Sequence, residues 1–285
     1  MRRELAAEVA GLQTMGVKPG LAVLLVGDNP ASRSYVTAKE KACEEIGIHS
    51  REVKLPADTS HEEILRVVQS FNDDASIHGI LVQLPLPDPS VETSVLNAVK
   101  PTKDVDGFHP VNVGRMMLGL PTFLPCTPHG ILHMLKRSGH ETSGRHVVIV
   151  GRSNIVGRPL ANLLSQKSSL GNATVTMCHT GTRNLPFFTK QADILIAATG
   201  RPHTITADMV REGVVVVDVG VNRVSDPSTS KGFRLVGDVD FHDVAEKAAA
   251  ITPVPGGVGP MTITMLLHNT IQSARMHAGL TPGWT

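Results

Sequence analysis

A tyrosine and a lysine stand four residues apart in the stretch SYVTAKEKACEEIGI, and this tyrosine, Tyr35, is the only one in the chain. Alanine, glutamate and lysine dominate the stretch, which predicts a helix with Ser32 as N-cap that ends before Gly47. Positions i and i+4 lie on one helix face, so Tyr35 and Lys39 should point the same way. A lysine with a lowered pKa could relay a proton, whereas a solvated lysine beside an anchoring tyrosine would not. The pattern alone leaves both interpretations open.

A second candidate site is the glycine turn in VVIVGRSNIVGRPLANLL, which reads as strand, turn and helix. Gly151 follows the strand and Gly157 opens the helix, so backbone N–H groups and the helix dipole would face a phosphate. The spacing G-x-x-x-x-x-G departs from the dinucleotide fingerprint G-x-G-x-x-G, and a purely structural turn is the alternative. The strand–turn–helix context favours nucleotide binding.

The next strand indicates which nucleotide would bind. It ends in MCHTGTRN, without the acidic residue that NAD enzymes usually place there for the ribose hydroxyls. Arg152, Ser153, Thr180 and Arg183 instead lie on loops that could approach a 2′-phosphate, and a guanidinium binds phosphate bidentately. Simple solvation is the alternative for Arg158 and Arg183. The sequence therefore favours NADP over NAD.

Apolar runs separated by amphipathic stretches predict the elements that would position these residues. We expect strands at Leu21–Val26 and at 49–56, 79–87, 146–151, 173–179, 192–200 and 213–220. We expect helices at 60–72, with Ser60 and Glu63 as a capping box, and at 125–139, entered by Thr127 and Pro128. Further helices are expected near Arg158–Gln166, Leu185–Gln191 and Thr206–Glu212, and at 260–279. Strands alternating with helices predict parallel sheets.

The predicted fold class is α/β with two domains and a cleft between them. A three-layer α/β substrate domain would span residues 1–138 and be completed by the C-terminal helix at 261–285. A Rossmann-like, doubly wound parallel-sheet domain at 139–260 would hold NADP. A tyrosine and lysine four apart also occur in short-chain dehydrogenases, but there the pair follows the glycine loop within the same sheet. Here it precedes Gly151 and belongs to the other domain, which excludes that family.

Composition narrows the function classes. The chain has 285 residues with 41% hydrophobic and 19% charged residues, and its net charge of +1 and 3% aromatic content give no reason to expect nucleic-acid binding. No apolar run is long enough to cross a bilayer, and the N-terminus lacks a signal core. Cys43, Cys126 and Cys178 are scattered and predict buried thiols in a reducing compartment. The 13 histidines show no H-E-x-x-H motif and no i, i+4 pair supported by a carboxylate, so no metal site is expected.

Six segments together carry a family resemblance: PASRSYVTAKEKACEEIGI, GILVQLPLP, KDVDGFHPVNVGR, PCTP, VVIVGRSNIVGRP and ITPVPGGVGPMT. The chain resembles the methylenetetrahydrofolate dehydrogenase/cyclohydrolase family, the bifunctional enzymes of folate one-carbon metabolism. No one segment is unique, but all six appear in the family's order and span nearly the whole chain.

The resemblance assigns roles to individual residues. It implies that Tyr35 stacks on the aminobenzoate of folate, that Lys39 acts at the one-carbon bridge, and that Gln83 hydrogen-bonds Lys39. It implies that Asp106 binds the polar edge of the pterin and that Ser32 lies near the same lysine. Plainer interpretations are that Gln83 satisfies strand-end backbone and that Asp106 forms an Asx turn.

The candidate residues can be gathered by role. Catalytic candidates are Lys39, Gln83, Tyr35 and Asp106; substrate-binding candidates are Tyr35, Ser32, Gln83, Asp106 and Pro260; cofactor-binding candidates are Gly151, Arg152, Ser153, Val156, Gly157, Thr180, Gly200, Val221, Gly256, Gly257 and Gly259. The segments VGVNR and PVPGGVGP match the nicotinamide-side loops of the family. The resemblance also makes Leu84–Pro85 and Val254–Pro255 candidates for cis peptides.

The implied activity is twofold. The chain would oxidise 5,10-methylenetetrahydrofolate to 5,10-methenyltetrahydrofolate with NADP+, and hydrolyse that product to 10-formyltetrahydrofolate. A cytoplasmic homodimer with a folate substrate, and no nucleic-acid or membrane partner, is expected from the family. Alternatives are a monofunctional dehydrogenase, another two-domain NADP-dependent dehydrogenase of shikimate type, and a non-catalytic NADP-binding sensor. A substrate panel would separate them.

Two features depart from the family pattern. Family members usually begin with a short strand and a turn before the first helix. This chain begins with MRRELAAEVAGLQTMG, which we expect to be that amphipathic helix, so we expect the preceding piece to be missing or misassigned. The tail LTPGWT, with the single Trp284, matches no family segment.

Overall fold

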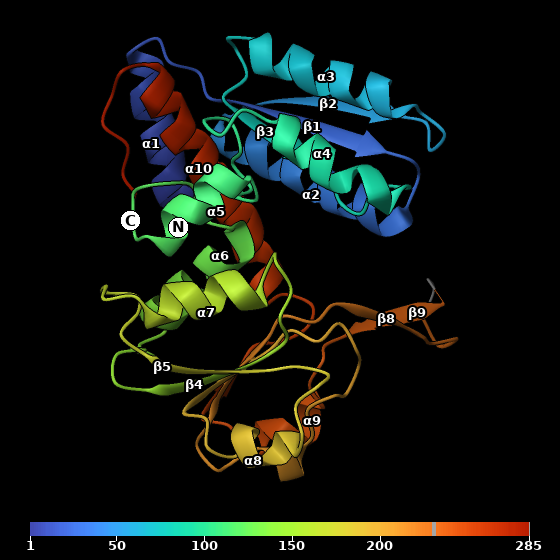
Figure 1. Cartoon of the computed structure of the whole chain (residues 1–285), viewed down its shortest axis with the longest axis vertical. Helices are drawn as coiled ribbons and strands as arrows, with labels where there is room; N and C mark the ends of the chain where they lie inside the picture. The colour runs from blue at the N-terminus through green and yellow to red at the C-terminus, as the bar shows by residue number, and fades with distance from the viewer. Residues whose placement is uncertain (230–231, 285) are drawn as a thin grey trace. The chain divides into compact units, whose positions relative to one another are not determined.

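The computed structural model describes residues 1–229 and 232–284 of the chain, and it consists of two compact units (Figure 1). Unit 1 comprises Met1–Cys126 with Ile263–Thr285, and unit 2 comprises Thr127–Thr262. The sequence places the boundaries at 138 and 261, so the two divisions differ chiefly in the unit that receives the helix Cys126–Arg137. Each unit has its own parallel sheet and its own apolar core.

Unit 1 is built on a parallel sheet of three strands in the order β2–β1–β3. All three strands were expected and the structure confirms them, although the third ends at Val82, before the expected residue 87. The elements of this unit are α1 Arg2–Thr14, β1 Gly20–Val26, α2 Pro30–Ile46, β2 His49–Leu55, α3 His61–Asp73, β3 Gly79–Val82, η1 Pro89–Val91, α4 Glu92–Ala98 and α5 Pro110–Met117, with α10 Val258–His277 reaching it from Ile263 on.

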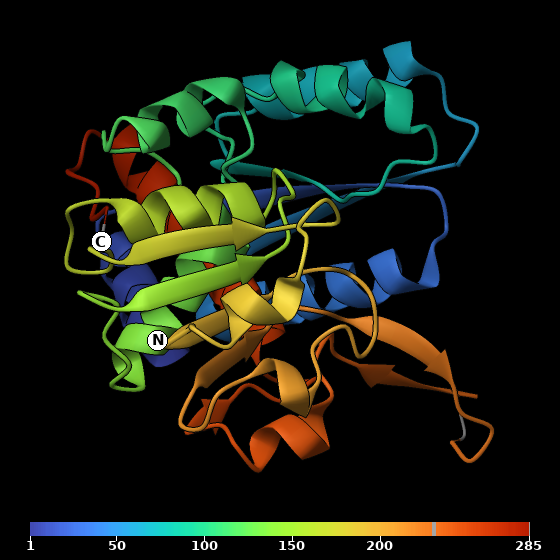
Figure 2. The ribbon, with the colours of Figure 1, turned by 60° about the horizontal axis from the view of Figure 1, so that its bottom comes forward.

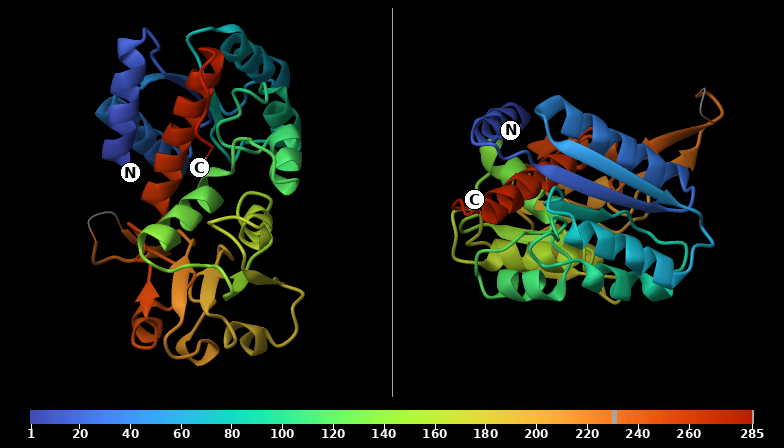
Figure 3. Two further views of the ribbon diagram at one scale, coloured as in Figure 1. Left: turned by 90° about the vertical axis from the view of Figure 1, so that its left-hand side faces the viewer. Right: turned by 90° about the horizontal axis from the view of Figure 1, so that it is seen from above.

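The central strand β1 supplies both faces of the unit 1 core, because successive side chains point to opposite sides of a sheet. Leu21, Val23 and Leu25 join a cluster with buried residues of α1, α2 and α10. Ala22, Leu24 and Val26 join the other cluster, with residues of α3 and α4. Figure 3 shows α1 and α10 side by side over their face of the sheet. The expected three-layer α/β arrangement is confirmed.

Helix α2 begins three residues earlier than the sequence suggests, at Pro30 rather than after an N-cap at Ser32. Pro30 takes the first helical position, which suits its fixed φ and missing N–H. The side chain of Asn29, just before it, accepts a hydrogen bond from the Ser32 backbone N–H (3.3 Å). The prediction of Ser32 as N-cap is therefore wrong, and Ser32 is a buried residue of the first turn. At the other end Gly47, with φ +83°, follows the helix as predicted.

The cap predicted for α3 is confirmed, because the Ser60 hydroxyl accepts a hydrogen bond from the Glu63 backbone N–H (3.2 Å). The Glu63 carboxylate, expected to reach back to Ser60, lies instead against the Arg66 guanidinium. Of the two hydrogen bonds of the predicted capping box, the one to the Ser60 hydroxyl therefore caps this helix. This helix packs its Ile64, Val68 and Phe71 side chains into the cluster that it shares with α4.

The last helix, α10, is predicted correctly but carries buried polar residues along its length. The single O–H of Ser273 lies within hydrogen-bond distance of two backbone carbonyls, those of His78 (2.5 Å) and Thr102 (2.8 Å). The Asn269 amide donates to the carbonyls of Val105 (2.8 Å) and Leu124 (3.0 Å). Buried backbone carbonyls need such partners, so α10 fastens two loops of unit 1 as well as filling its core.

Unit 2 holds a parallel sheet of five strands in the order β10–β7–β6–β4–β5 (Figure 2). Its elements are α6 Cys126–Arg137, which starts at the last residue of unit 1, β4 His146–Val150, α7 Gly157–Ser165, β5 Thr174–Cys178, α8 Leu185–Thr189, β6 Ile194–Ala197, η2 Ala207–Met209, β7 Val215–Asp218, β8 Asn222–Ser225, β9 Phe233–Val236, α9 Phe241–Ala245 and β10 Ala250–Ile251. Helix α7 packs on β4 and β5, while α8, η2 and α9 supply residues to the cluster on the other face. The doubly wound arrangement is confirmed.

The strand order places a topological switch in unit 2. From β4 the chain goes to β5 on one side, and then to β6, β7 and β10 on the other. In open α/β sheets, ligands bind beyond the carboxyl ends of the strands at such a point. Here that point lies between β4 and β6.

One predicted helix of unit 2 is wrong, and several elements were not foreseen. The stretch Thr206–Glu212 forms only the single turn η2, because Val210 is extended (φ −122°, ψ 154°) and buried. Strands β8 and β9 form an antiparallel ribbon, and α4, α5, α9 and β10 also escaped prediction. These elements are short, so periodicity gave little to detect. Within the described residues no helix is long and apolar enough to cross a membrane.

A buried histidine holds the first residue of β1. His78 Nδ1 accepts a hydrogen bond from the Gly20 backbone N–H (3.0 Å), which requires that nitrogen to be unprotonated. Burial, with the nearby His277 and Lys103 adding to it, lowers the pKa of His78 to about 4. His78 is therefore a neutral structural acceptor at physiological pH.

Acid should weaken unit 1 through this histidine. The folded-state pKa of about 4 lies below the ordinary 6.5, so the unfolded chain binds more protons between these values and stability falls as pH drops from 6.5 to 4. We expect His78→Ala to cost about 2 kcal/mol at pH 7, since the Gly20 N–H loses its partner, and to flatten this pH dependence. Urea denaturation midpoints across pH measure both. His49→Ala, at an exposed histidine, is the control, and an equal acid loss in both variants would contradict the assignment.

Candidate active site

Lys39 lies on the buried face of α2 and is only 9% exposed. Its neighbours on that face, Val36, Ala42 and Cys43, belong to the apolar core of unit 1. The Lys39 ammonium donates to Gln83 Oε1 (2.9 Å). A lysine in this setting is not the solvated surface residue of the plainer interpretation.

Gln83 is fixed by the strand that it follows. Its backbone N–H donates to the Leu24 carbonyl (2.9 Å), which extends the pairing of β3 with β1 by one residue. Its side-chain Nε2 donates to the Leu84 carbonyl (2.7 Å), so the amide oxygen is left facing Lys39. The next peptide, Leu84–Pro85, is cis as predicted. The side chain of Gln83 thus serves strand-end backbone and Lys39 at once.

Asp106 completes the charged group around Lys39. Burial raises the pKa of Asp106 to about 6, the Lys39 ammonium opposes this rise, and the Asp104 carboxylate adds to it. Burial likewise lowers the pKa of Lys39, and the Asp106 carboxylate opposes that shift. Burial disfavours the charged forms of both Lys39 and Asp106, and each charge stabilises the other.

The turn that carries Asp106 is organised by Asp104, which sequence reasoning passed over. The Asp104 carboxylate accepts hydrogen bonds from the backbone N–H groups of Phe108 (3.2 Å) and His109 (2.8 Å), and from the Asn112 amide (2.8 Å). The backbone-bonding role considered for Asp106 thus belongs to Asp104, the first aspartate of KDVDG. The partners of Asp106 are instead the Lys39 ammonium and the Cys126 thiol.

Tyr35 and Ser32 lie one and two turns before Lys39 on α2. Tyr35 is 38% exposed, and partial burial raises the pKa of its phenol. Ser32 is buried. Because positions 32, 35 and 39 are three, four and seven residues apart, they share one side of the helix. The structure therefore brings Tyr35, Lys39, Gln83 and Asp106 into one part of unit 1, with Ser32 beside them.

The glycine turn of unit 2 is as tight as the sequence predicts. Gly151 follows β4 with φ +137°, and a Cβ there would lie 2.1 Å from the Ala198 carbonyl oxygen. A Cβ on Gly157, the first residue of α7, would lie 2.1 Å from the Gly151 carbonyl oxygen. The Ser153 hydroxyl accepts from the Val156 N–H (3.1 Å), so it orders the turn from within.

The basic residues expected to face a 2′-phosphate lie in the loops that follow two neighbouring strands, β4 and β5. Arg152 follows β4 and is exposed, as is Arg183 in the loop after β5. That loop is shaped by the Thr182 hydroxyl, which accepts from the His179 N–H (2.8 Å), and Thr180 lies within it. Arg158, by contrast, donates to Asn154 in the turn that precedes α7 (2.8 Å).

The remaining cofactor candidates lie at the same edge of the unit 2 sheet. Gly200 follows β6, Val221 follows β7 and is 45% exposed, and the glycines Gly256, Gly257 and Gly259 lie between β10 and the body of α10. The carboxyl ends of parallel strands share one edge. The Val254–Pro255 peptide before these glycines is cis, as predicted, and Pro260 lies in the first turn of α10.

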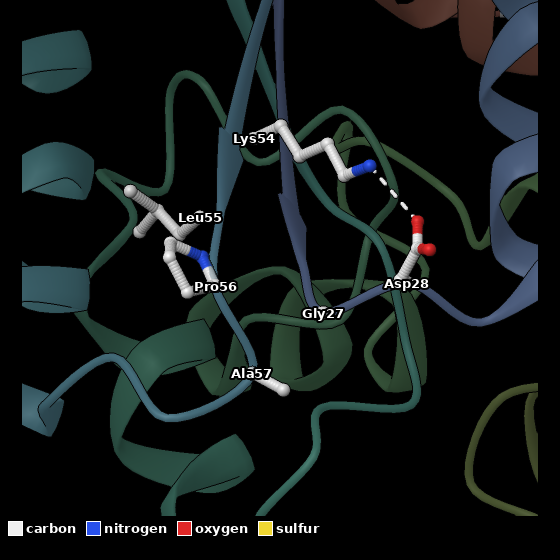
Figure 4. Close-up of a pocket in the computed structure, with 6 residues that line it drawn as sticks. All are labelled: Gly27, Asp28, Lys54, Leu55, Pro56 and Ala57. Carbon is white, nitrogen blue, oxygen red and sulfur yellow. Dashed lines mark hydrogen bonds and ion pairs between the residues drawn. The ribbon is translucent and has the colours of Figure 1, made fainter.

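A separate cavity of about 300 Å³ lies at the carboxyl ends of β1 and β2 (Figure 4). The Lys54 ammonium and the Asp28 carboxylate meet across it (2.9 Å), and Arg33 also pairs with Asp28 (3.2 Å). All three side chains are about half-exposed or more, and such pairs contribute little to stability. The lining contains none of the predicted site residues. Within the described residues no three histidine, cysteine or acidic side chains form a metal-binding group.

Comparison with known proteins supplies a family. The model "Tetrahydrofolate dehydrogenase/cyclohydrolase, catalytic domain" matches residues 1–106, and "Tetrahydrofolate dehydrogenase/cyclohydrolase, NAD(P)-binding domain" matches residues 125–278. The "Bifunctional protein FolD" of Dehalococcoides mccartyi (strain CBDB1) is 58% identical over 282 residues, covering 98% of this chain and 95% of that protein.

Solved structures agree with that result. The Trypanosoma brucei N5,N10-methylenetetrahydrofolate dehydrogenase-cyclohydrolase, complexed with NADP cofactor and an inhibitor, has a TM-score of 0.92 and 38% identity, covering 97% of this chain and 94% of that one. Shikimate dehydrogenase of Aquifex aeolicus has a TM-score of 0.51 and 12% identity, covering 94% and 95%, a likeness of fold alone. The chain belongs to the tetrahydrofolate dehydrogenase/cyclohydrolase family.

Proposed function

We propose that this chain oxidises 5,10-methylenetetrahydrofolate to 5,10-methenyltetrahydrofolate with NADP+ and hydrolyses the product to 10-formyltetrahydrofolate. The family membership supports both reactions. The observation that carries the hydrolytic step is the buried Lys39, bonded to Gln83 with Asp106 nearby. A monofunctional dehydrogenase would not need such a lysine.

In the hydrolytic step a water must lose a proton as it attacks the cationic methenyl carbon. A neutral Lys39 amine takes that proton, and Gln83 holds the amine in place. Opening of the bond between the former methenyl carbon and N5 then moves the hydroxyl proton to N5, leaves the formyl group on N10 and releases one proton overall. An uncharged amine also avoids repelling the cation. Burial favours this neutral form.

Substrate would be held in unit 1 by groups of complementary chemistry. The Tyr35 ring offers a face for stacking on the aminobenzoate, and the Asp106 carboxyl accepts from the polar edge of the pterin. Its pKa of about 6 lets it share a proton with that edge near neutral pH. Ser32 is a further substrate contact that we propose in unit 1, and Pro260, in the first turn of α10, is one that we propose outside it. Residues 1–138 with 261–285 would form this folate-binding domain, and 139–260 the NADP domain.

NADP, when bound, supplies the hydride acceptor of the dehydrogenase reaction. Close backbone approach at Gly151 and Gly157 suits the pyrophosphate. Arg152, Ser153 and Thr180 suit the 2′-phosphate. The other contacts that we propose come from Val156, Gly200, Val221, Gly256, Gly257 and Gly259. We further propose a homodimer located in the cytoplasm, on the family expectation.

Removing the amine should abolish hydrolysis while leaving the fold. We expect Lys39→Met to lower the rate of methenyltetrahydrofolate hydrolysis by at least about 100-fold, since general base catalysis supplies that much. The loss of methenyl absorbance with time measures it. Lys41→Met, at an exposed lysine on the same helix, is the matched control. Full hydrolysis by Lys39→Met would refute the role of Lys39.

The pH profile should report the same group. If neutral Lys39 is the base, kcat for hydrolysis rises with pH through a lysine pKa lying below the ordinary 10.5. The Asp106 carboxylate holds that pKa up, so Asp106→Asn should move the rise to lower pH, whereas Asp28→Asn, at an exposed carboxylate, should not. Lys39→Arg should remove the rise because a guanidinium stays charged. If the pH profile of Lys39→Arg matched that of the wild type, Lys39 would not be the base that takes the proton from water.

Cofactor choice should depend on the two exposed arginines. Arg152→Gln and Arg183→Gln should each raise KM for NADP+ by about tenfold or more and leave KM for NAD+ nearly unchanged, because only NADP+ has the 2′-phosphate. Arg158→Gln, on the neighbouring helix turn, is the control. Steady-state dehydrogenase kinetics with both cofactors decide this. Equal losses for NADP+ and NAD+ would contradict it.

A further inference from the structure

Two buried aspartates of unit 2 lie outside every role assigned so far. Asp218 ends β7 and is 2% exposed, and Asp238 follows β9 and is 0% exposed. Charged side chains are almost never fully buried unless they are paired or hydrogen-bonded, because burial is costly. Their hydrogen-bond partners show which parts of the chain the two carboxylates hold in place.

Asp238 gathers two loops at the carboxyl edge of the sheet. Its Oδ2 accepts from the backbone N–H groups of Thr199 (2.5 Å) and Gly200 (2.9 Å), just after β6. Its Oδ1 accepts from the Asn222 amide (2.9 Å), at the start of β8. One carboxylate thus fixes the loop that carries Gly200 to the segment that follows Val221.

Asp218 in turn fixes Asp238. Its Oδ1 accepts from the backbone N–H groups of Gly220 (2.9 Å) and Asp238 (2.9 Å), and its Oδ2 from that of Val239 (3.0 Å). The two carboxylates together accept six hydrogen bonds from three chain segments. Hydrogen bonds to a charged acceptor are roughly twice as strong as neutral ones, which suits this pair to holding loops rigid.

Two glycines make room for this arrangement. A Cβ on Gly220 would lie 2.1 Å from Asp238 Oδ1, and one on Gly237 would lie 1.7 Å from Asp218 Oδ2. Each carboxylate therefore occupies the space that a side chain would need on the segment next to the other aspartate. The segments DVG and GDVD require each other's residue types for steric reasons.

We propose that Asp238, held in place by Asp218, is a positioning residue for NADP+. It acts through the loops that carry Gly200 and Val221, and does not itself touch the cofactor. The inference rests on the proposed cofactor site of unit 2. An amide at position 238 keeps the shape of the carboxylate but lacks its charge and one of its two acceptor oxygens, which weakens its hold on these loops.

The test uses the full chain and direct binding of NADP+, measured by isothermal titration calorimetry. Asp238→Asn should raise Kd for NADP+ by about tenfold or more, which corresponds to loss of a charged hydrogen bond. Gly220→Ala should produce a similar loss by displacing the same carboxylate. Asp240→Asn, a partly exposed aspartate two residues away, is the matched control and should leave Kd within twofold.

Hydrolysis of methenyltetrahydrofolate, which consumes no NADP+, separates positioning from folding. A raised Kd for NADP+ with hydrolysis retained within about twofold supports the proposal. An unchanged Kd for NADP+ in Asp238→Asn overturns the proposal. So does a joint loss of NADP+ binding, hydrolysis and thermal stability in both Asp238→Asn and Gly220→Ala, because Asp218 and Asp238 would then only support the fold. A wild-type chain that binds NADP+ but turns over neither folate would instead refute the proposed function, and the binding comparison would still stand.

Discussion

The cost of removing one ammonium group from water shapes unit 1. Lys39 lies among core residues of α2, where its charged form is disfavoured. Its position is sustained by the amide of Gln83, whose own orientation follows from strand pairing and from its hydrogen bond to the Leu84 carbonyl. Asp106 supplies the opposite charge, and its turn depends on Asp104 and on the α10 residue Asn269. The chemistry of one side chain therefore depends on β1, β3, the aspartate turn and the last helix together.

Unit 2 solves a different problem, because its proposed residues are mostly backbone groups of loops. A loop lacks the regular backbone hydrogen bonds that orient N–H groups in a helix or sheet. In unit 2, buried carboxylates and close contacts at glycines orient them instead. Ser153 does this on a small scale within the turn after β4, and Asp218 and Asp238 do it between strands. The two units thus use polar groups for different purposes. In unit 1 they adjust the pKa of one side chain, and in unit 2 they fix the direction of backbone N–H groups.

The sequence predicts the long elements of this fold well and the short ones poorly. Continuous apolar runs such as Leu21–Val26 are buried on both faces and are confirmed as strands. The helix expected over Thr206–Glu212 is wrong because the need to bury Val210 and enter β7 outweighs local propensity. Lys39, Gln83 and Asp106 are brought together as the resemblance implies. Asp218 and Asp238 were missed because they bond to groups distant in sequence, which no local pattern reveals; the nearby glycines were the available hint. Asp104 bonds only to residues four to eight positions ahead, and it was missed because the resemblance directed attention to Asp106.

The discontinuous make-up of unit 1 has a consequence for how the protein is made. Its core cluster contains Ile263, Met265, Leu266, Leu267 and Ile271 of α10, which are synthesised long after β1. Unit 2 is continuous, and domains generally fold as units while the chain emerges from the ribosome. The nucleotide unit can therefore be complete while β1 still exposes apolar surface awaiting its covering helix. Until then this sheet lacks part of its apolar cover, and the lysine acquires its final surroundings only when the last helix docks.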